Sequence, residues 1–364
     1  MEYNDTLLIP GQHIRPPVTE ETAVALLERL YGMRATSVRE LNAYDDRNYH
    51  VVCDGPPANP HAINLEKTGY VLKVINSLDS RKTDVIEAQT ELMIFLNQRD
   101  VCCPLPVKNV NGAYFSLETL KSENTMEKYA VRLLVYRPGE LLYHVKITDE
   151  LLRKIGSFTA RIDEILTGFN HPAYDDHKSL WMLTSVPRVQ QFTYAIKSSL
   201  DKQLVHDVIV SFQREVLPIM DQLEQTVIHG DLNEHNIIVS PDGKDIAAVI
   251  DFGDSHRTCR VFELAIVLCY MILQTADVGM GRHVVEGYER IKKLTDVEKK
   301  TLKISVCARI CQSLVMGAYS YLHDPENQYL LSTQKTGWML LKRLWPMSQG
   351  DVMQAWGLTN SLNE

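Results

Sequence analysis

The stretch "VIHGDLNEHNIIVS", residues 227–240, places His229, Gly230, Asp231 and Asn236 between apolar residues that are typical of β-strands. Asp231 and Asn236 are separated by five positions. A second apolar run, "AAVIDFGD", follows at residues 247–254 and contains Asp251, fifteen positions after Asn236. Both runs predict short strands with polar side chains at their ends.

This spacing is the one that phosphoryl transfer needs. The protein-kinase catalytic loop has an Asp and an Asn five residues apart, and a metal-binding Asp follows in front of Phe-Gly. Asp231, Asn236 and Asp251 repeat that order. Each residue taken singly has a purely structural explanation, and we expect His229 to orient the loop rather than to exchange protons. Only the ordered set predicts a phosphotransferase.

An early strand supplies the lysine that such an enzyme uses to hold phosphates. Lys73 stands in the middle of the apolar run "GYVLKVIN", and the helical pattern "DVIEAQTELMIFLNQ" follows it. That helix carries Glu87 and Glu91, and either one is able to hold the lysine.

"HGDLNEHN" and "IDFGD" resemble the aminoglycoside phosphotransferase and choline kinase superfamily, in which HGDxxxxN replaces the protein-kinase catalytic loop. The segments "AYDDRN", "VFELAIVLCYM", "CQSLVMGAYS" and "KTGW" narrow the resemblance to the hydroxylysine kinase family, from about residue 19 to 356. The resemblance implies a cytoplasmic enzyme that phosphorylates the hydroxyl of 5-hydroxy-L-lysine with GTP as donor. Its partners would be a hydroxy amino acid and a nucleotide.

The resemblance also implies roles for individual residues. Asp231 would orient the substrate hydroxyl and accept its proton, and Asn236 and Asp251 would bind Mg²⁺. Lys73 would hold the donor phosphates. Glu263, in "VFELA", stands where the superfamily often has an Asp that braces the catalytic loop.

The nucleotide would meet a hinge strand and a polar turn. By the same resemblance, the strand from Leu134 to Arg137 offers backbone groups to the nucleobase, so Val135 and Arg137 are expected at the nucleotide, and so is Asn48 in the turn "AYDDRN".

That turn differs from the glycine-rich loop of protein kinases, since it contains no glycine. Two carboxylates beside a polyphosphate would repel it, so Asp45 and Asp46 are expected to point away from the phosphates. An ordinary hairpin turn and a carboxylate that meets a cationic substrate both remain open. Glu234 and Asp254 are the other acids close enough to the predicted chemistry to bind a substrate amine.

The element pattern predicts a two-lobe, protein-kinase-like α+β fold. Strands prevail up to residue 137, where Pro138 and Gly139 interrupt the run "YAVRLLVYRPGELL". Helices prevail after it. We therefore expect a nucleotide-binding lobe with a small antiparallel sheet over residues 1–137, and a larger helical lobe for catalysis and substrate binding over 138–364.

Composition excludes several classes of function. The chain has 364 residues, 45% of them hydrophobic, and a net charge of −8, which argues against a general nucleic-acid binder. Its longest apolar run, "LAIVLCYMIL", is too short to span a bilayer. Seven cysteines, an odd number, are typical of reduced thiols in a cytoplasmic protein.

Three rival functions compete with this interpretation. A protein kinase is disfavoured, because only about ten residues separate Asp251 from the next helical run, which leaves no room for a long activation segment. The second rival is a kinase of the same superfamily that acts on choline, homoserine or an aminoglycoside. The third is a non-catalytic nucleotide-binding module.

Overall fold

The chain folds into two compact units, Met1–Pro138 and Gly139–Glu364. The structure is a computed structural model that describes residues 7–62, 64–122 and 125–358. The division falls at Pro138 and Gly139, where Gly139 has φ +143° and a Cβ would come within 2.3 Å of Ile238 Cγ2. Only glycine fits this position.

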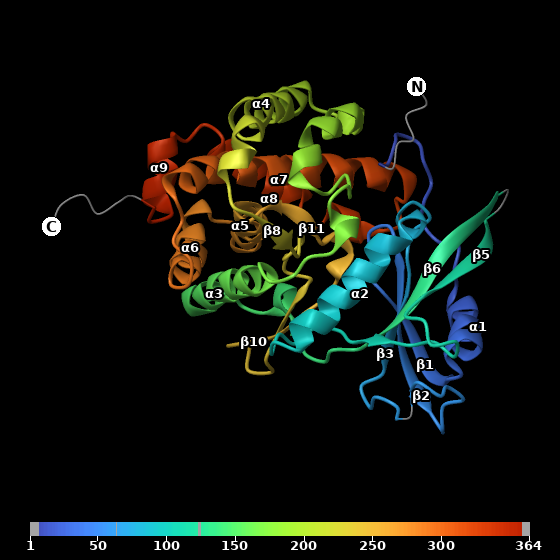
Figure 1. The fold of residues 1–364 in the computed structure, drawn as a ribbon. Coiled ribbons are helices and arrows are strands. Elements are labelled where there is room, and N and C mark those ends of the chain that lie inside the picture. Colours follow the sequence, from blue (N-terminus) through green and yellow to red (C-terminus); the bar gives the residue numbers. More distant parts are fainter. Residues whose placement is uncertain (1–6, 63, 123–124, 359–364) are drawn as a thin grey trace. The chain divides into compact units, whose positions relative to one another are not determined.

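The first unit is built on an antiparallel sheet (Figure 1). In the described residues its strands run in the order β1-β2-β3-β6-β4, and β5 also pairs with β6. The elements are α1 (Glu20–Tyr31), β1 (Arg34–Leu41), β2 (Arg47–Asp54), β3 (Tyr70–Val74), α2 (Thr83–Asn97), β4 (Pro106–Val107), β5 (Ser116–Ser122) and β6 (Thr125–Val135).

Capping residues set both ends of helix α1. The Thr19 side chain accepts a hydrogen bond from the Thr22 N–H, and Gly32 closes the helix in the left-handed conformation. The buried face of α1 joins one apolar cluster with Tyr49 and Leu72 of the sheet. Since side chains alternate along a strand, Lys73 lies on the opposite face of β3.

The second unit is mainly helical, as expected. Its strands are β7 (Glu140–Leu141), β8 (Gln225–Ile228), β9 (Ile237–Val239), β10 (Ile246–Val249) and β11 (His256–Cys259). Its α-helices are α3 (Asp149–Leu166), α4 (Ser199–Glu215), α5 (Val261–Thr275), α6 (Gly281–Glu289), α7 (Asp296–His323), α8 (Gln334–Leu344) and α9 (Gln349–Ala355). None of the helices within the described ranges is long and apolar enough to cross a membrane.

The apolar pattern of the sequence predicts that helix α4 begins near Asp207 and ends or kinks at Pro218. The helix begins earlier, because Ser198 caps it and the Ser198 side chain accepts from the Asp201 N–H, so α4 starts at Ser199. Pro218 does not lie in the helix. It lies in the following 3₁₀ helix η5 (Leu217–Gln222), after α4 has ended at Glu215.

Two small sheets hold the polar loops of the second unit. Strand β8 pairs with β11, and β9 pairs with β10 and β7, all antiparallel. The "HGDLNEHN" loop therefore joins a strand of one sheet to a strand of the other. Helix α5 follows β11 directly and packs against α7.

Helices α3 and α6 approach each other through glycines. A Cβ at Gly156 would lie 1.9 Å from the Val284 carbonyl oxygen, and one at Gly287 would lie 1.9 Å from that of Arg153. Ser157 Oγ also donates to the Gly287 carbonyl at 2.8 Å. The helices can pack this closely only because neither position carries a side chain.

We predict that Gly287→Ala lowers the free energy of unfolding by about 3 kcal/mol, the upper end for overpacking, because the helix backbones must separate. Gly350→Ala is the matched control. Gly350 is also helical, and its nearest Cβ neighbour would lie 3.8 Å away, so alanine there should be neutral or stabilise by up to about 1 kcal/mol. Chemical denaturation of both variants measures these free energies of unfolding. Equal changes for the two substitutions would contradict the close packing of α3 and α6.

Candidate active site

The loop that carries Asp231 requires glycine at position 230. Gly230 has φ +83°, and a Cβ there would lie 2.3 Å from the Asp254 carbonyl oxygen. Its N–H donates to Oε2 of Glu263 at 3.0 Å, and the Glu263 side chain is completely buried on α5. Glu263 therefore braces the loop, as the resemblance implied.

His229 orients the same loop as a neutral imidazole. Its Nδ1 accepts from the Asp231 N–H at 3.3 Å, so the proton is on Nε2, which donates to the Ile250 carbonyl at 3.0 Å. The ring packs on Phe252, with centroids 4.6 Å apart. Burial lowers the pKa of His229 to about 4, in agreement with an orienting role and not an acid/base one.

The five-residue spacing of Asp231 and Asn236 brings the two side chains into contact. Asn236 Nδ2 donates to the Asp231 backbone oxygen and to Asp231 Oδ2, both at 2.9 Å. Asn233 Nδ2 donates to the same Oδ2 at 2.8 Å. The loop thus turns back on itself and fixes one carboxylate oxygen with two amides.

These bonds leave Asn236 Oδ1 on the other side of the amide, where it can accept a cation. Asp251 follows β10 in the left-handed conformation, φ +62°, and its Oδ1 accepts from the Gly253 N–H at 3.3 Å. No group of three or more His, Cys, Asp or Glu in the described ranges could hold a metal ion. A set of one amide and one carboxylate fits Mg²⁺, which keeps several waters and takes substrate phosphates as ligands.

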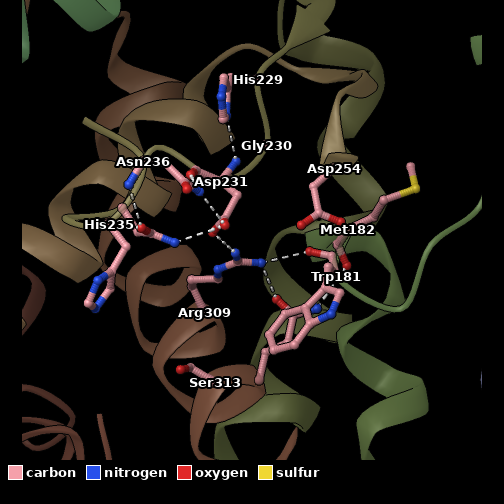
Figure 2. A network of polar contacts seen from close by, with 12 residues as sticks. Trp181, Met182, His229, Gly230, Asp231, His235, Asn236, Asp254, Arg309 and Ser313 are labelled. Atoms are coloured by element: carbon pink, nitrogen blue, oxygen red, sulfur yellow. Dashed lines mark hydrogen bonds and ion pairs between the residues drawn. The ribbon is translucent and has the colours of Figure 1, made fainter. Parts of the chain in front are cut away.

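Arg309 of α7 completes the surroundings of Asp231 (Figure 2). Its Nη2 donates to Asp231 Oδ1 at 2.7 Å, and its Nη1 donates to the Trp181 carbonyl at 2.8 Å and to Gln312 Oε1 at 3.0 Å. The guanidinium lies over the rings of Trp181 and Tyr270, 5.2 and 5.5 Å from their centroids. Only 1% of the side chain is exposed.

The charge of Asp231 results from opposing influences. Burial raises its pKa, Arg309 lowers it, and Asp251 raises it, with a net value of about 6. Asp231 is therefore ionised at neutral pH largely because Arg309 compensates for its burial.

Glu234 and Asp254, the other predicted acids of this unit, differ in their surroundings. Glu234 is 5% exposed, and its Oε2 has no hydrogen-bond partner within the described ranges. Asp254 is half-buried at the end of the 3₁₀ helix η6 (Phe252–Asp254).

In the first unit Lys73 is buried and forms an ion pair with Asp46, with Nζ 2.9 Å from Oδ2. Asp46 Oδ1 accepts from the backbone and side-chain nitrogens of Asn76 at 2.8 and 3.0 Å. The expectation that Asp46 points away from the phosphate site is thus wrong here, because a buried ammonium needs a counter-charge. Asp45 is also partly buried, and burial, together with Asp46, raises its pKa to about 7.

The residues expected at the nucleobase are only partly available. The Val135 N–H donates to the Leu105 carbonyl at 2.8 Å, so it cannot also donate to a base. The Arg137 side chain is tied to the Cys103 carbonyl at 2.7 Å. Asn48 lies opposite Lys73 in the β2–β3 register, with its Oδ1 buried and lacking a hydrogen-bond partner in the described part of the chain.

Glu87 and Glu91 both lie on α2 and are exposed. That one of these two glutamates holds Lys73 stays a prediction.

Comparison with known proteins identifies the family to which this chain belongs. The sequence profile described as "Phosphotransferase enzyme family" matches residues 37–295. The chain belongs to this phosphotransferase family. It is 35% identical to a hydroxylysine kinase of Xenopus laevis, over 94% of each chain, and 34% identical to that of Bos taurus, over 94% of this chain and 93% of the other. The protein is therefore an enzyme of the kinase class.

A solved structure supports the fold. Amicoumacin kinase, determined with AMP-PNP and Ca²⁺, aligns with a TM-score of 0.66 at 16% identity, over 92% of this phosphotransferase and 97% of that chain. The predicted kinase-like α+β fold, with an antiparallel sheet in the N-terminal unit and helices in the C-terminal one, is confirmed.

Arg309 is the residue of this phosphotransferase site that sequence reasoning missed. The available signal was an arginine inside the otherwise apolar helical run "ISVCARICQSLVM", residues 304–316. A charged residue on the buried face of a helix needs a partner. The sequence does not say which one, because Asp231 is 78 positions away.

We predict that Arg309→Met lowers the free energy of unfolding by about 2–4 kcal/mol, because it leaves the Asp231 carboxylate, 19% exposed, without its counter-charge. Adding Asp231→Asn should recover at least about 1 kcal/mol relative to the sum of the single effects. Arg161→Met, at an exposed position of α3, is the control. Strict additivity in denaturant unfolding would show that the pair carries no coupling.

Proposed function

We propose that this phosphotransferase transfers the γ-phosphoryl group of GTP to the hydroxyl of 5-hydroxy-L-lysine, giving 5-phosphooxy-L-lysine and GDP. The observation that carries the proposal is the 34–35% identity to hydroxylysine kinases, which extends over 93–94% of those chains. We also propose a cytoplasmic location, with small-molecule partners and neither nucleic acid nor membrane.

Asp231 orients the attacking hydroxyl and accepts its proton. Its Oδ2 is occupied by two amides, whereas Oδ1 has Arg309 as its hydrogen-bond donor and keeps a second lone pair for the substrate. The carboxylate therefore faces the hydroxyl with a fixed orientation, which is most of what a phosphotransferase contributes.

Asn236 and Asp251 would hold Mg²⁺, which supplies charge neutralisation of the donor phosphates when it is bound. Lys73 of the first unit would hold the donor phosphates. Val135, Arg137 and Asn48 remain candidates for the nucleoside, through groups other than the Val135 N–H.

A choline, homoserine or aminoglycoside kinase remains the alternative, and a non-catalytic nucleotide-binding module is disfavoured by the retention of Lys73, Asp231, Asn236 and Asp251. In protein kinases the corresponding residue types serve phosphoryl transfer together.

We predict that Asp251→Ala abolishes Mg²⁺-dependent turnover. Asn236→Ala should raise the Mg²⁺ concentration for half-maximal turnover and lower the turnover less, because the carboxylate of Asp251 carries the negative charge of the ligand set. Asp221→Ala is the control, since it removes an exposed carboxylate of η5 that is not a proposed metal ligand. Its Mg²⁺ midpoint should not move. Equal turnover of the parent enzyme with and without Mg²⁺ would contradict the assignment.

For the substrate, we predict that GTP with 5-hydroxy-L-lysine has a kcat/KM at least about tenfold above that with choline, homoserine or an aminoglycoside, roughly 1.4 kcal/mol of transition-state binding. L-lysine should bind and inhibit without being phosphorylated. The measurement is a coupled GDP-release assay, repeated with ATP, with Asp231→Asn as the background control. Faster turnover of choline or an aminoglycoside would leave a kinase with another substrate.

A further inference from the structure

Two adjacent residues of the catalytic loop have buried polar atoms that make no hydrogen bond. These are Oε2 of Glu234 and Nε2 of His235, and neither has a partner within the described ranges. The Glu234 side chain is 7% exposed and that of His235 is 16% exposed. His235 Nε2 lies 3.6 Å from Glu234 Oε1, too far for a hydrogen bond.

Leaving such atoms unsatisfied is costly, at about 1–3 kcal/mol each. Native proteins keep an unpartnered buried group mainly where a ligand, water or catalytic task uses it. These two atoms stand three and four positions after Asp231, the residue that receives the substrate hydroxyl. Because they lie in the loop that carries the proposed base, we expect these atoms to contact the substrate.

Aromatic rings surround the imidazole. Tyr143, of the 3₁₀ helix η2 (Leu142–His144), stacks on His235 with centroids 4.5 Å apart and 25° between planes. Tyr329, of the 3₁₀ helix η8 (Gln328–Leu331), meets it edge-on at 5.0 Å. The Tyr143 N–H donates to the Glu234 carbonyl at 2.9 Å, which ties η2 to the loop. Tyr143 is 45% exposed, so this group reaches the surface.

The chemistry of these groups selects a cation that donates hydrogen bonds. A carboxyl oxygen accepts, a neutral imidazole accepts at Nε2 when its proton is on Nδ1, and tyrosine faces attract positive charge. An ammonium group has three N–H donors and a full charge, and it matches this set.

The other acids are less suited to an ammonium ion. Asp46 is already paired with Lys73 and Asn76 in the first unit. Asp254 is half-buried and lies three positions after Asp251, at the end of η6. Among the four predicted substrate acids, Glu234 alone combines near-complete burial with an oxygen that lacks a hydrogen-bond partner in the described part of the chain.

We propose that Glu234 and His235, flanked by Tyr143 and Tyr329, bind the side-chain ammonium of the acceptor substrate and so select an amine on the carbon next to the reacting hydroxyl. This rests on the proposed function, because 5-hydroxylysine carries its ammonium on the carbon adjacent to the hydroxyl-bearing one. Selection acts through the loop that also holds Asp231, which places the hydroxyl and the amine in one rigid frame.

The test compares Glu234→Gln with the parent enzyme on two substrates, 5-hydroxy-L-lysine and 2-amino-5-hydroxyhexanoate, which lacks the side-chain amine. The parent should prefer the amine by roughly 10- to 100-fold in kcat/KM, mainly through KM, the range expected for a hydrogen bond to a charged group. Glu234→Gln should lose most of that ratio. Asp221→Asn, which removes one carboxylate at an exposed position of η5, should retain it.

A binding measurement makes the result independent of turnover. Calorimetry with L-lysine and L-norleucine, which differ at the side-chain ammonium, should show at least about tenfold tighter binding of lysine to the parent and about equal binding to Glu234→Gln. Tyr143→Leu, at an exposed position, should weaken lysine binding roughly threefold and serves if Glu234→Gln does not fold.

The outcomes separate the two proposals. Turnover of 5-hydroxylysine with an unchanged amine preference in Glu234→Gln would overturn this inference and leave the function intact, and it would assign the unpartnered atoms to ordered water. If 5-hydroxylysine is not turned over but lysine binding still depends on Glu234, the proposed function would fail and the ammonium site would stand. Equal binding of lysine and norleucine by the parent enzyme would overturn the inference in either case.

Discussion

The ion pair between Asp231 and Arg309 is the interaction on which the organisation of the second unit depends. Burying a carboxylate is unfavourable unless hydrogen bonds and a counter-charge replace water. Here α7 supplies the charge and the loop supplies two amides, Asn233 and Asn236. Arg309 in turn is held by the Trp181 carbonyl and Gln312. One ion pair thus connects three distant segments of the chain.

The same constraint explains the rest of the loop. Glu263 is completely buried, and it accepts the Gly230 N–H that the tight turn would otherwise leave unsatisfied. Burial raises its pKa to about 7, and the bond from Gly230 opposes that rise. His229 ties the Asp231 backbone to the Ile250 carbonyl just before Asp251. The proposed base and the proposed metal ligands are therefore parts of one hydrogen-bonded structure and cannot move separately.

The first unit also contains a buried charge that is neutralised by an ion pair. Lys73 is buried in a sheet, and Asp46 neutralises it from the turn before β2. From the sequence alone, repulsion between like charges predicts that Asp45 and Asp46 point away from a phosphate. The fold adds a second interaction for Asp46, which is attraction to the buried ammonium of Lys73.

The sequence by itself determined those features that depend on neighbours within a few positions. These include the caps of α1 at Thr19 and Gly32, the strands on either side of the catalytic loop, the Asp231–Asn236 spacing, and the family to which the chain belongs. Local geometry suffices for them, because capping, strand alternation and loop closure act over short distances along the chain. Only the tertiary structure decided that Arg309 meets Asp231, that Asp46 meets Lys73 and that Leu105 occupies the Val135 N–H. It also decided that Glu234 Oε2 is buried with no hydrogen-bond partner among the described residues. Each of these depends on which groups lose water together, and packing brings those groups together from positions that no local pattern relates.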